Sequence, residues 1–517
     1  MLVAGLIAAG ALSAGMADAR ANAVQTWNTE MLSLIRQTSA LLVDGPPEVA
    51  REIAILGTAM SDAVNAASGN VFTPYAYAGG PVSGASAEAA ALAAGYTALT
   101  SIFSNPIWQN PTGGNATLIT NTILPQINTT YSNALAGLGG GASVTAGVNL
   151  GIAAANAVTA ARANDGAVAA ILDGLTPQMP PGSGSVPGVY VPPSATGGRP
   201  EMFPTWGTVT PFGVTGAQGT AIKNASTTSL PPLNSPAYAQ GLLETQCMGI
   251  STGASLTAGA QSACQAAGFV GRTQAQVNAA LFWNDPGGTI QPPGHWLEIA
   301  NTIMQGHGLS LLDSARLTSL LGMGLTDAGI YAWDIKYISN LWRPITAIRA
   351  CDTAANDGSV TWNSSFTTCD AAWQSEIATP PHPDYVAGHP AFSGAAAAII
   401  AGFLGTDSIQ FCSTSDSYQN GALGFVPQIT ICFDSISAGS SGPYGSTYSR
   451  VLGGIHTPFA VDDAETLGEL LGAQILSNFN VSPIPEPATL ALLGFGAAGL
   501  LYARRRSHDP EDAVCLT

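Results

Sequence analysis

Charged residues are scarce in this chain, and basic residues are the scarcest. Of 517 residues 9% are charged, with 15 Lys and Arg against 32 Asp and Glu, which gives a formal net charge of −17. A nucleic-acid-binding protein needs a basic patch, and the sequence has none, so we expect no nucleic-acid partner. Disorder is excluded as well, because 46% of the residues are hydrophobic. The length suffices for one large or two ordinary domains, and the low charge favours an exported protein.

Strand signals are few, and apolar residues instead recur at helical spacing. Helices are expected over 23–42, 84–103, 143–173, 271–283 and 295–350. Irregular loops are expected over the Pro- and Gly-rich segment 174–240, around 351–369 and over 405–445. The prediction is an all-α, mainly α-helical bundle with long Pro/Gly-rich loops, divided into an N-terminal half (22–240) and a C-terminal half (241–480).

The chain also lacks the cysteine spacing of a zinc site, since it has no CxxC motif and no Cys/His cluster. Six of its seven cysteines lie in the body of the chain, an even number that favours three disulfides in an oxidising compartment. The simplest pairing joins sequence neighbours: Cys247–Cys264, Cys351–Cys369 and Cys412–Cys432.

Both ends carry features of targeting signals. Residues 2–17 are apolar, and small residues lead to Ala19-Arg20-Ala21, a pattern typical of a signal peptide over 1–21 that lacks a charged n-region. A buried N-terminal helix is the alternative.

The C-terminal segment 481–507 combines Pro485-Glu486-Pro487, an apolar run over 488–502 and three arginines, with a tail over 508–517. This order resembles the PEP-CTERM sorting signal of Gram-negative bacteria, which implies processing by an exosortase and transient membrane anchoring. A plain anchor would leave the body of the chain in the same compartment, the cell envelope or the extracellular space.

Three separated segments contain residues suited to an oxyanion. In WDIKYISNLWRP, Lys336 and Arg343 would lie two turns apart on one face of a helix that Pro344 ends. In YVAGHPAFSG, the Gly388 amide and a helix start would supply N–H donors, and His389 a proton. Each segment alone also fits a purely structural interpretation. The first could be an exposed basic face of a helix, and the second a helix cap.

The third segment, YSRVLGGIHTP, holds Arg450 and His456 on either side of Gly453-Gly454, where the chain can bend. On a straight helix the two side chains would diverge, so a bend is needed for both to reach one ligand. Alone, His456 would fit a buried structural histidine.

The combined order Lys-x6-Arg-Pro, Gly-His and Ser-Arg-x5-His resembles the vanadium-dependent haloperoxidases and the type 2 phosphatidic acid phosphatases (PAP2). WNTEML, WGTVTPF and QVNAALFWNDPGG extend the likeness to the long bacterial haloperoxidase branch over most of 22–480. The resemblance implies the helical fold of that superfamily and a bound vanadate or phosphate.

The resemblance also implies the role of each residue. Lys336, Arg343 and Arg450 would neutralise the oxyanion, and the Gly388 N–H would hold one of its oxygens. His456 would be the apical vanadium ligand in a peroxidase or the nucleophile in a phosphatase. His389 would be the acid/base.

The chain departs from the family pattern at two positions. Ala387 replaces the usual serine, and losing one hydrogen bond to a charged group costs about 1.5–3 kcal/mol. Ala460 replaces an aspartate that often follows the last histidine, so His456 needs another partner.

His382 stands at a position where the bromoperoxidases of the resembled family also have a histidine. This resemblance implies bromide or iodide rather than chloride as the halide. A loop histidine without a role in the site is the alternative. His295 and His307 are interpreted as structural.

The sequence therefore predicts an exported vanadate-dependent haloperoxidase acting on hydrogen peroxide and halide. A PAP2-type phosphatase acting on phosphate esters without a cofactor is the first alternative. The second is a non-catalytic envelope protein whose site has decayed.

Overall fold

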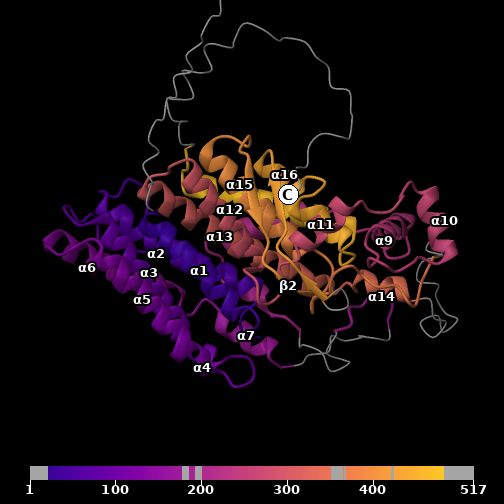
Figure 1. Cartoon of the computed structure of the whole chain (residues 1–517), viewed down its shortest axis with the longest axis horizontal. Coiled ribbons are helices and arrows are strands. Elements are labelled where there is room, and N and C mark those ends of the chain that lie inside the picture. The colour runs from indigo at the N-terminus through magenta and orange to yellow at the C-terminus, as the bar shows by residue number, and fades with distance from the viewer. Residues whose placement is uncertain are drawn as a thin grey trace, which may run out of the picture.

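The structure is a computed structural model that describes residues 21–176, 186–192, 201–350, 365, 368–420 and 424–482. Its fold is mainly helical, as predicted (Figure 1). The helices are α1 (Ala23–Thr38), α2 (Pro46–Ala67), α3 (Ala87–Phe103), α4 (Ala116–Leu118), α5 (Leu124–Ala136), α6 (Ala142–Arg162), α7 (Ala167–Gly174), α8 (Gly216–Ser226), α9 (Pro236–Met248), α10 (Ala258–Ala266), α11 (Gln274–Phe282), α12 (Gln291–Gly306), α13 (Leu311–Ser339), α14 (Pro344–Arg349), α15 (Gly388–Leu404), α16 (Ile436–Ser441), α17 (Ser446–Leu452) and α18 (Pro458–Asn478). Shorter turns are η1 (Pro106–Gln109), η2 (Ile119–Ile123) and η4 (Trp206–Thr208).

Helix α13 is the longest helix described, and it joins the two halves of the molecule. Ser310 caps its start by accepting a hydrogen bond from the Asp313 amide. On one side α13 packs on α2 so closely that a Cβ at Gly322 would lie 2.6 Å from Ala54 Cα. On the other side it packs on α15. The N-terminal helices α1–α6 gather at one end of the molecule, and α9, α10 and α14 lie at the other end (Figure 1).

Helices α15 and α18 form the second close pair. A Cβ at Gly468 of α18 would lie 2.1 Å from the Ala391 carbonyl oxygen of α15, so only glycine allows this approach. The close contact fixes the start of α15 relative to the start of α18. Both starts lie beside the candidate site described below.

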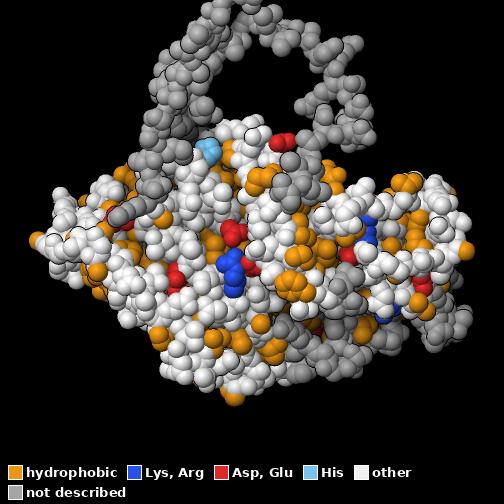
Figure 2. All heavy atoms as spheres, viewed as in Figure 1, with side chains coloured by type: hydrophobic (Ala, Val, Ile, Leu, Met, Phe, Trp, Pro, Cys, Tyr) orange, Lys and Arg blue, Asp and Glu red, His pale blue; other side chains and the backbone are white. Residues whose placement is uncertain are grey.

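Helix α6 is long and apolar enough to cross a membrane by length and composition. It packs against α2 and α3 through Leu150, Ala154 and Val158, which are buried. This helix is therefore part of the N-terminal bundle. Charged side chains are few on the face that Figure 2 shows, in keeping with the composition, and near its centre a blue side chain lies against red ones.

Two sequence predictions about loops were wrong. The segment 174–240 contains α8 and the start of α9, because Thr215 with Gln218 forms a capping box and Ser235 caps α9. The segment 405–445 contains α16 and two antiparallel pairs, β1 (Phe411–Thr414) with β4 (Thr430–Phe433) and β2 (Tyr418–Asn420) with β3 (Gly424–Val426). Their alternation of buried and exposed residues spans only three or four positions, which is too short to stand out in the sequence.

Two of the predicted disulfides are confirmed, Cys247–Cys264 and Cys412–Cys432. The second joins directly opposite residues of β1 and β4. Cys351 lies outside the described residues, as do the proposed signal peptide up to residue 20 and nearly all of the C-terminal sorting segment.

Candidate active site

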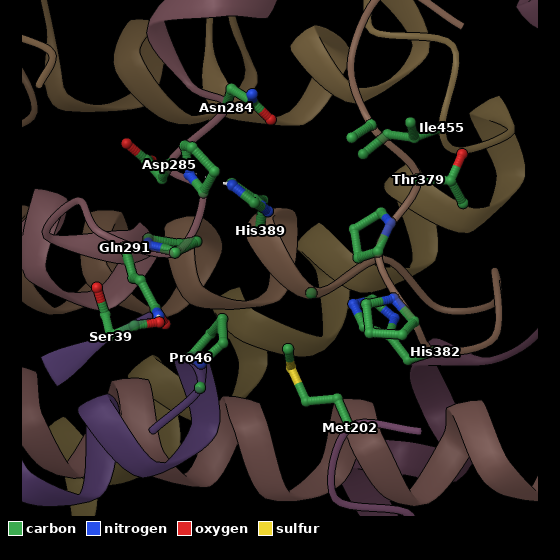
Figure 3. A pocket seen from close by; sticks show the side chains of 18 of the residues that line it. Ser39, Pro46, Met202, Asn284, Asp285, Gln291, Thr379, His382, His389 and Ile455 are labelled. Carbon is green, nitrogen blue, oxygen red and sulfur yellow. Dashed lines mark hydrogen bonds and ion pairs between the residues drawn. The ribbon is translucent and has the colours of Figure 1, made fainter. Parts of the chain in front are cut away.

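A cavity of about 270 Å³ lies between the two halves of the molecule, and three of its histidines come from separate parts of the chain. His382 precedes α15, His389 lies in the first turn of α15, and His456 lies between α17 and α18. Figure 3 shows His389 and His382 on different sides of this cavity, with Met202 and Pro46 along one wall. Gly388 lines the cavity too. The side chains of Lys336, Arg343 and Arg450 lie behind these residues and are fully or almost fully buried.

His456 is held by a carboxylate. Its Nδ1 lies 2.5 Å from Asp384 Oδ1, and the other oxygen, Oδ2, accepts a hydrogen bond from Thr457 Oγ1 at 3.1 Å. A carboxylate can only accept, so the proton of a neutral His456 sits on Nδ1 and its Nε2 carries the free lone pair. The predicted need for another partner in place of Ala460 is thus met by Asp384.

Arg343 contacts two of the cavity histidines. Nη1 donates to His456 Nε2 at 3.0 Å and to the Ile455 carbonyl at 2.8 Å, while Nη2 lies 2.9 Å from His382 Nδ1. Nε donates to the His382 carbonyl at 2.6 Å. Five N–H groups in a planar fork allow this sharing.

The prediction that Lys336 and Arg343 share one helix was wrong. Helix α13 ends at Ser339, Asn340 adopts a left-handed conformation with φ 47°, and Arg343 is the extended residue before α14. Pro344 forces this break, because a residue that precedes proline is disfavoured in the helical region. The break places Arg343 beside His456.

Lys336 reaches the site from the last turn of α13. Its Nζ donates to the Pro383 carbonyl at 2.9 Å and to the Asp384 carbonyl at 3.3 Å. An ammonium has three donors, so one remains after these two bonds. Burial, and then the nearby Arg343, lower the pKa of Lys336 well below its ordinary value, although Asp384 opposes this.

His389 lies between an acidic and a basic group. Its Nε2 is 3.4 Å from Arg450 Nη1 and 3.9 Å from Asp285 Oδ2. Arg450 comes from α17, which ends at Gly453, and Gly454 with φ 76° turns the chain toward His456. The bend predicted at Gly453-Gly454 is therefore present, and it turns the chain between Arg450 and His456.

The helix start at Gly388 presents first-turn amides, which lack acceptors within the helix. A Cβ at Gly388 would lie 3.1 Å from the Trp333 ring, so the backbone here passes close beneath that ring. Ala387 is the N-cap of α15 and is fully buried, and it is not among the residues that line the cavity.

The buried basic groups lower one another's proton affinity. Burial, and then Arg343 and Lys336, lower the pKa of His456 well below its ordinary value. Burial and Arg450 do the same to the pKa of His389, and burial and Lys336 to the pKa of His382. Burial lowers the pKa of Arg450 to about 10, with Asp285 opposing. At neutral pH the three imidazoles are accordingly neutral, and an anion placed among them would draw protons in.

Sequence reasoning missed three residues of this network: Asp384, Asp285 and His295. His295 had been interpreted as structural, yet its Nδ1 lies 3.1 Å from Asp285 Oδ1. Asp384 stands two positions after His382 in PHPDY, which is the one signal that pointed to it. Asp285 follows FWN in a stretch already noted for its family likeness, without any acid/base pattern around it. His307 is exposed and lies away from the cavity, as predicted.

Within the described residues no group of three or more His, Cys, Asp and Glu side chains is arranged to hold a metal ion. An oxyanion bound through one histidine needs no such group.

Comparison with known protein families gives two matches along the chain. Residues 316–481 match the second helical-bundle domain of the vanadium chloroperoxidase (VCPO) type, and residues 483–506 match the PEP-CTERM protein-sorting motif. Residues 316–481 are therefore similar to the second helical bundle of the vanadium chloroperoxidases.

Relatives of this chain are distant. The vanadium chloroperoxidase of Curvularia inaequalis is 28% identical over 151 residues, which cover 26% of this chain and 24% of that protein. The aligned part thus spans about a quarter of this curated relative.

Solved structures share the fold over most of this chain. The first bacterial vanadium-dependent iodoperoxidase aligns over 90% of this chain and 97% of its own, with a TM-score of 0.64 and 18% identity. A bacterial vanadium-dependent chloroperoxidase in its holo form aligns over 87% of this chain and 95% of its own, with a TM-score of 0.54 and 16% identity. At these identities the likeness establishes the fold, and the PEP-CTERM motif implies export to the cell envelope.

Proposed function

We propose that this protein is a vanadate-dependent haloperoxidase that oxidises bromide or iodide with hydrogen peroxide. The balanced reaction consumes peroxide, halide and one proton and yields hypohalous acid and water. The observation that carries the proposal is His456, whose Nδ1 is fixed by Asp384 at 2.5 Å while its Nε2 lone pair faces Arg343 at the cavity.

The residues present fit a vanadate ion. Lys336, Arg343 and Arg450 supply three buried cationic groups, and an anion is the ligand that would relieve their mutual repulsion. Arg343 Nη1 now donates to His456 Nε2, and the two groups together would hold the ion, with the guanidinium supplying N–H donors to it. Vanadate, when bound, supplies the Lewis acidity that activates peroxide.

His389 is proposed to handle the proton that the reaction consumes. An imidazole between an acceptor, Asp285, and a donor, Arg450, is stabilised both with and without a proton on Nε2. The N–H groups at the start of α15, with Gly388 first, would hold one oxygen of the ion.

The choice of halide rests on His382 and on one structural neighbour. The His382 ring lies 5.0 Å from the Trp333 ring and close to Arg343, at the cavity wall. The neighbour with the TM-score of 0.64 is an iodoperoxidase. Both favour iodide or bromide over chloride.

Phosphatase activity is the second candidate function, because the same His456–Asp384 pair would suit a nucleophile attacking phosphorus. Such an enzyme needs no vanadate and would be inhibited by it, since vanadate competes for the phosphate position. The cavity would then accept phosphate monoesters or lipid phosphates.

Parallel assays of the purified protein distinguish these functions. Halide oxidation is measured with iodide or bromide and peroxide at increasing vanadate, and hydrolysis of p-nitrophenyl phosphate is measured without vanadate. Vanadate-dependent halide oxidation that is lost in His389→Ala and retained in His307→Ala is the expected result.

Hydrolysis without halide oxidation at any vanadate concentration would replace the first proposal by the second. Failure of both assays, together with unchanged behaviour of His389→Ala, would support the non-catalytic envelope protein. Export followed by exosortase processing would bring this activity to the cell surface or outside the cell, and cleavage within 483–506 in the native host tests that step.

A further inference from the structure

His295 of α12 is fully buried, and both of its ring nitrogens have polar partners. Nδ1 lies 3.1 Å from Asp285 Oδ1 and 3.2 Å from Asp285 Oδ2, so it faces both carboxylate oxygens. Nε2 lies 3.1 Å from Ser413 Oγ of β1. The ring packs against Phe282 and Trp283, with centroid distances of 4.9 and 4.6 Å. These contacts leave the ring little freedom to turn.

Asp285 connects this buried histidine to the cavity. The carboxylate lines the cavity, and its Oδ2 lies 3.2 Å from His295 Nδ1 and 3.9 Å from His389 Nε2. Asp285 adopts φ 44°, a left-handed conformation that is unfavourable for a residue with a side chain. Strain of this kind persists where surrounding contacts over-determine the conformation, and here the two histidines and Arg450 surround the carboxylate.

The electrostatic surroundings of His295 favour a cation. Burial works against a positive charge, but Asp285, Glu298 and Asp416 face the ring and raise the pKa of His295 overall. Arg36 offsets part of that field by pairing with Glu298 at 3.4 Å and with Asp416 at 2.9 Å. On the cavity side, His389, Arg450 and Tyr418 are further titratable or charged groups around the pair.

We propose that His295 is a positioning residue for the candidate acid/base His389, acting through Asp285. Its ring clamps both oxygens of the Asp285 carboxylate and holds Oδ2 toward His389, which keeps the His389 ring in one orientation. The inference deepens the proposed function, since it concerns the residue assigned to proton transfer there. It applies equally to peroxidase and phosphatase chemistry, because both use an acid/base at this position.

The role predicts a change that loss of packing alone would not produce. In His295→Gln the neighbouring imidazole, which lowers the pKa of His389, is gone, so the pKa of His389 should rise by about one pH unit. The pH profile of activity should shift upward by the same amount. The matched control is His307→Gln, which changes an exposed histidine outside the cavity and should shift nothing.

Imidazole ¹⁵N NMR of the vanadate-free protein gives a readout that does not depend on activity. Adding inorganic phosphate to the wild-type protein should move the His389 and His295 resonances together and leave His307 in place. This measurement also serves if His295→Gln fails to fold. A His389 response without any response at His295 would overturn the proposal, as would an unchanged His389 titration in folded His295→Gln.

The two proposals can fail separately. An enzyme without halide oxidation that still shows coupled His295 and His389 resonances would refute the haloperoxidase function alone. An active haloperoxidase whose pH profile is the same in His295→Gln would refute the positioning role alone.

Discussion

Asp384 and His456 face each other at 2.5 Å, although 72 positions separate them in the chain. The contact brings the segment before α15 against the segment before α18, and it fixes which ring nitrogen of His456 faces the cavity. Burial raises the pKa of Asp384 to about 7, with Arg343 and Lys336 opposing. Close contact with a ring N–H favours the ionised carboxylate, as these two cations do.

Replacing Asp384 by Asn tests this relationship. An amide keeps the size of the side chain but removes the charge that holds the Nδ1 proton and raises the basicity of Nε2. Affinity for vanadate or phosphate should fall by about 10–100-fold, as is typical when such a partner is lost. Calorimetric titration of both anions measures the effect, and Asp462→Asn on the exposed side of α18 is the control. Equal affinities in Asp384→Asn and wild type would contradict the role.

Restoring serine at position 387 should affect stability as well as binding. Ala387 is the N-cap of α15 and makes no side-chain capping bond, so a serine there would cap the helix and stabilise the protein by about 1 kcal/mol. Because Ala387 does not line the cavity, we expect a rise in melting temperature with less than a tenfold gain in anion affinity. Thermal unfolding and phosphate titration of Ala387→Ser separate the two effects. A large gain in affinity with an unchanged melting temperature would assign the hydroxyl to the anion.

Three buried carboxyls at the start of α2 and just before it should make the protein less stable in alkali. Burial raises the pKa of Asp44 to about 7 and of Glu48 to about 8, and it raises the pKa of Glu52 as well. Ordinary carboxyls in the unfolded chain titrate near 4. The folded state therefore holds extra protons, and the stability they confer is lost progressively as pH rises from about 4 through the folded pKa values of about 7 and 8.

Glu52→Gln tests that dependence, because both Glu52 carboxylate oxygens are buried without a hydrogen-bond partner. The variant should gain about 1–3 kcal/mol of unfolding free energy at pH 9 and much less at pH 5, near the pKa of an ordinary carboxyl. The histidines are the same in the variant and the wild type, so their contribution cancels in the comparison. Denaturant unfolding at both pH values gives the answer, with exposed Glu469→Gln as the control. A pH-independent effect would mean that Glu52 is ionised throughout.

Met202 should be the first described methionine to be oxidised during turnover. Its side chain lines the cavity beside His382, whereas Met60 and Met304 are fully buried in the core (Figure 3). Hypohalous acid transfers one oxygen to a thioether and leaves halide and a proton, which gives the sulfoxide. Peptide mass spectrometry after turnover with bromide, vanadate and peroxide should find the added oxygen on Met202 before any other described methionine. Met202→Leu should lose activity more slowly, and uniform oxidation with or without halide would refute the prediction.

The helical fold was predictable where apolar periodicity is long, as in α1, α3 and α13. Breaks were harder to predict. Asn340 and Arg343 read as part of one long helix, and only the local preference before Pro344 argues for the break.

The three segments of the site were recognisable because Lys336, His389 and Arg450 stand in motifs with fixed spacing. Asp384, Asp285 and His295 were not, because a carboxylate becomes a partner of a histidine only through packing between elements distant in sequence. His295 shows the point most clearly, since Ser413, its second partner, belongs to a strand that the sequence did not indicate.

The two halves of the molecule contribute different residues to the cavity. Every residue proposed to touch the anion comes from 336–456, whereas Leu41, Leu42, Pro46 and Met202 come from the N-terminal half and face the same space. Substitutions in the N-terminal half can therefore change the size and polarity of the substrate that the cavity admits, while the residues that hold the anion stay unchanged. In such a fold the range of substrates can evolve while the residues of the reacting centre are retained.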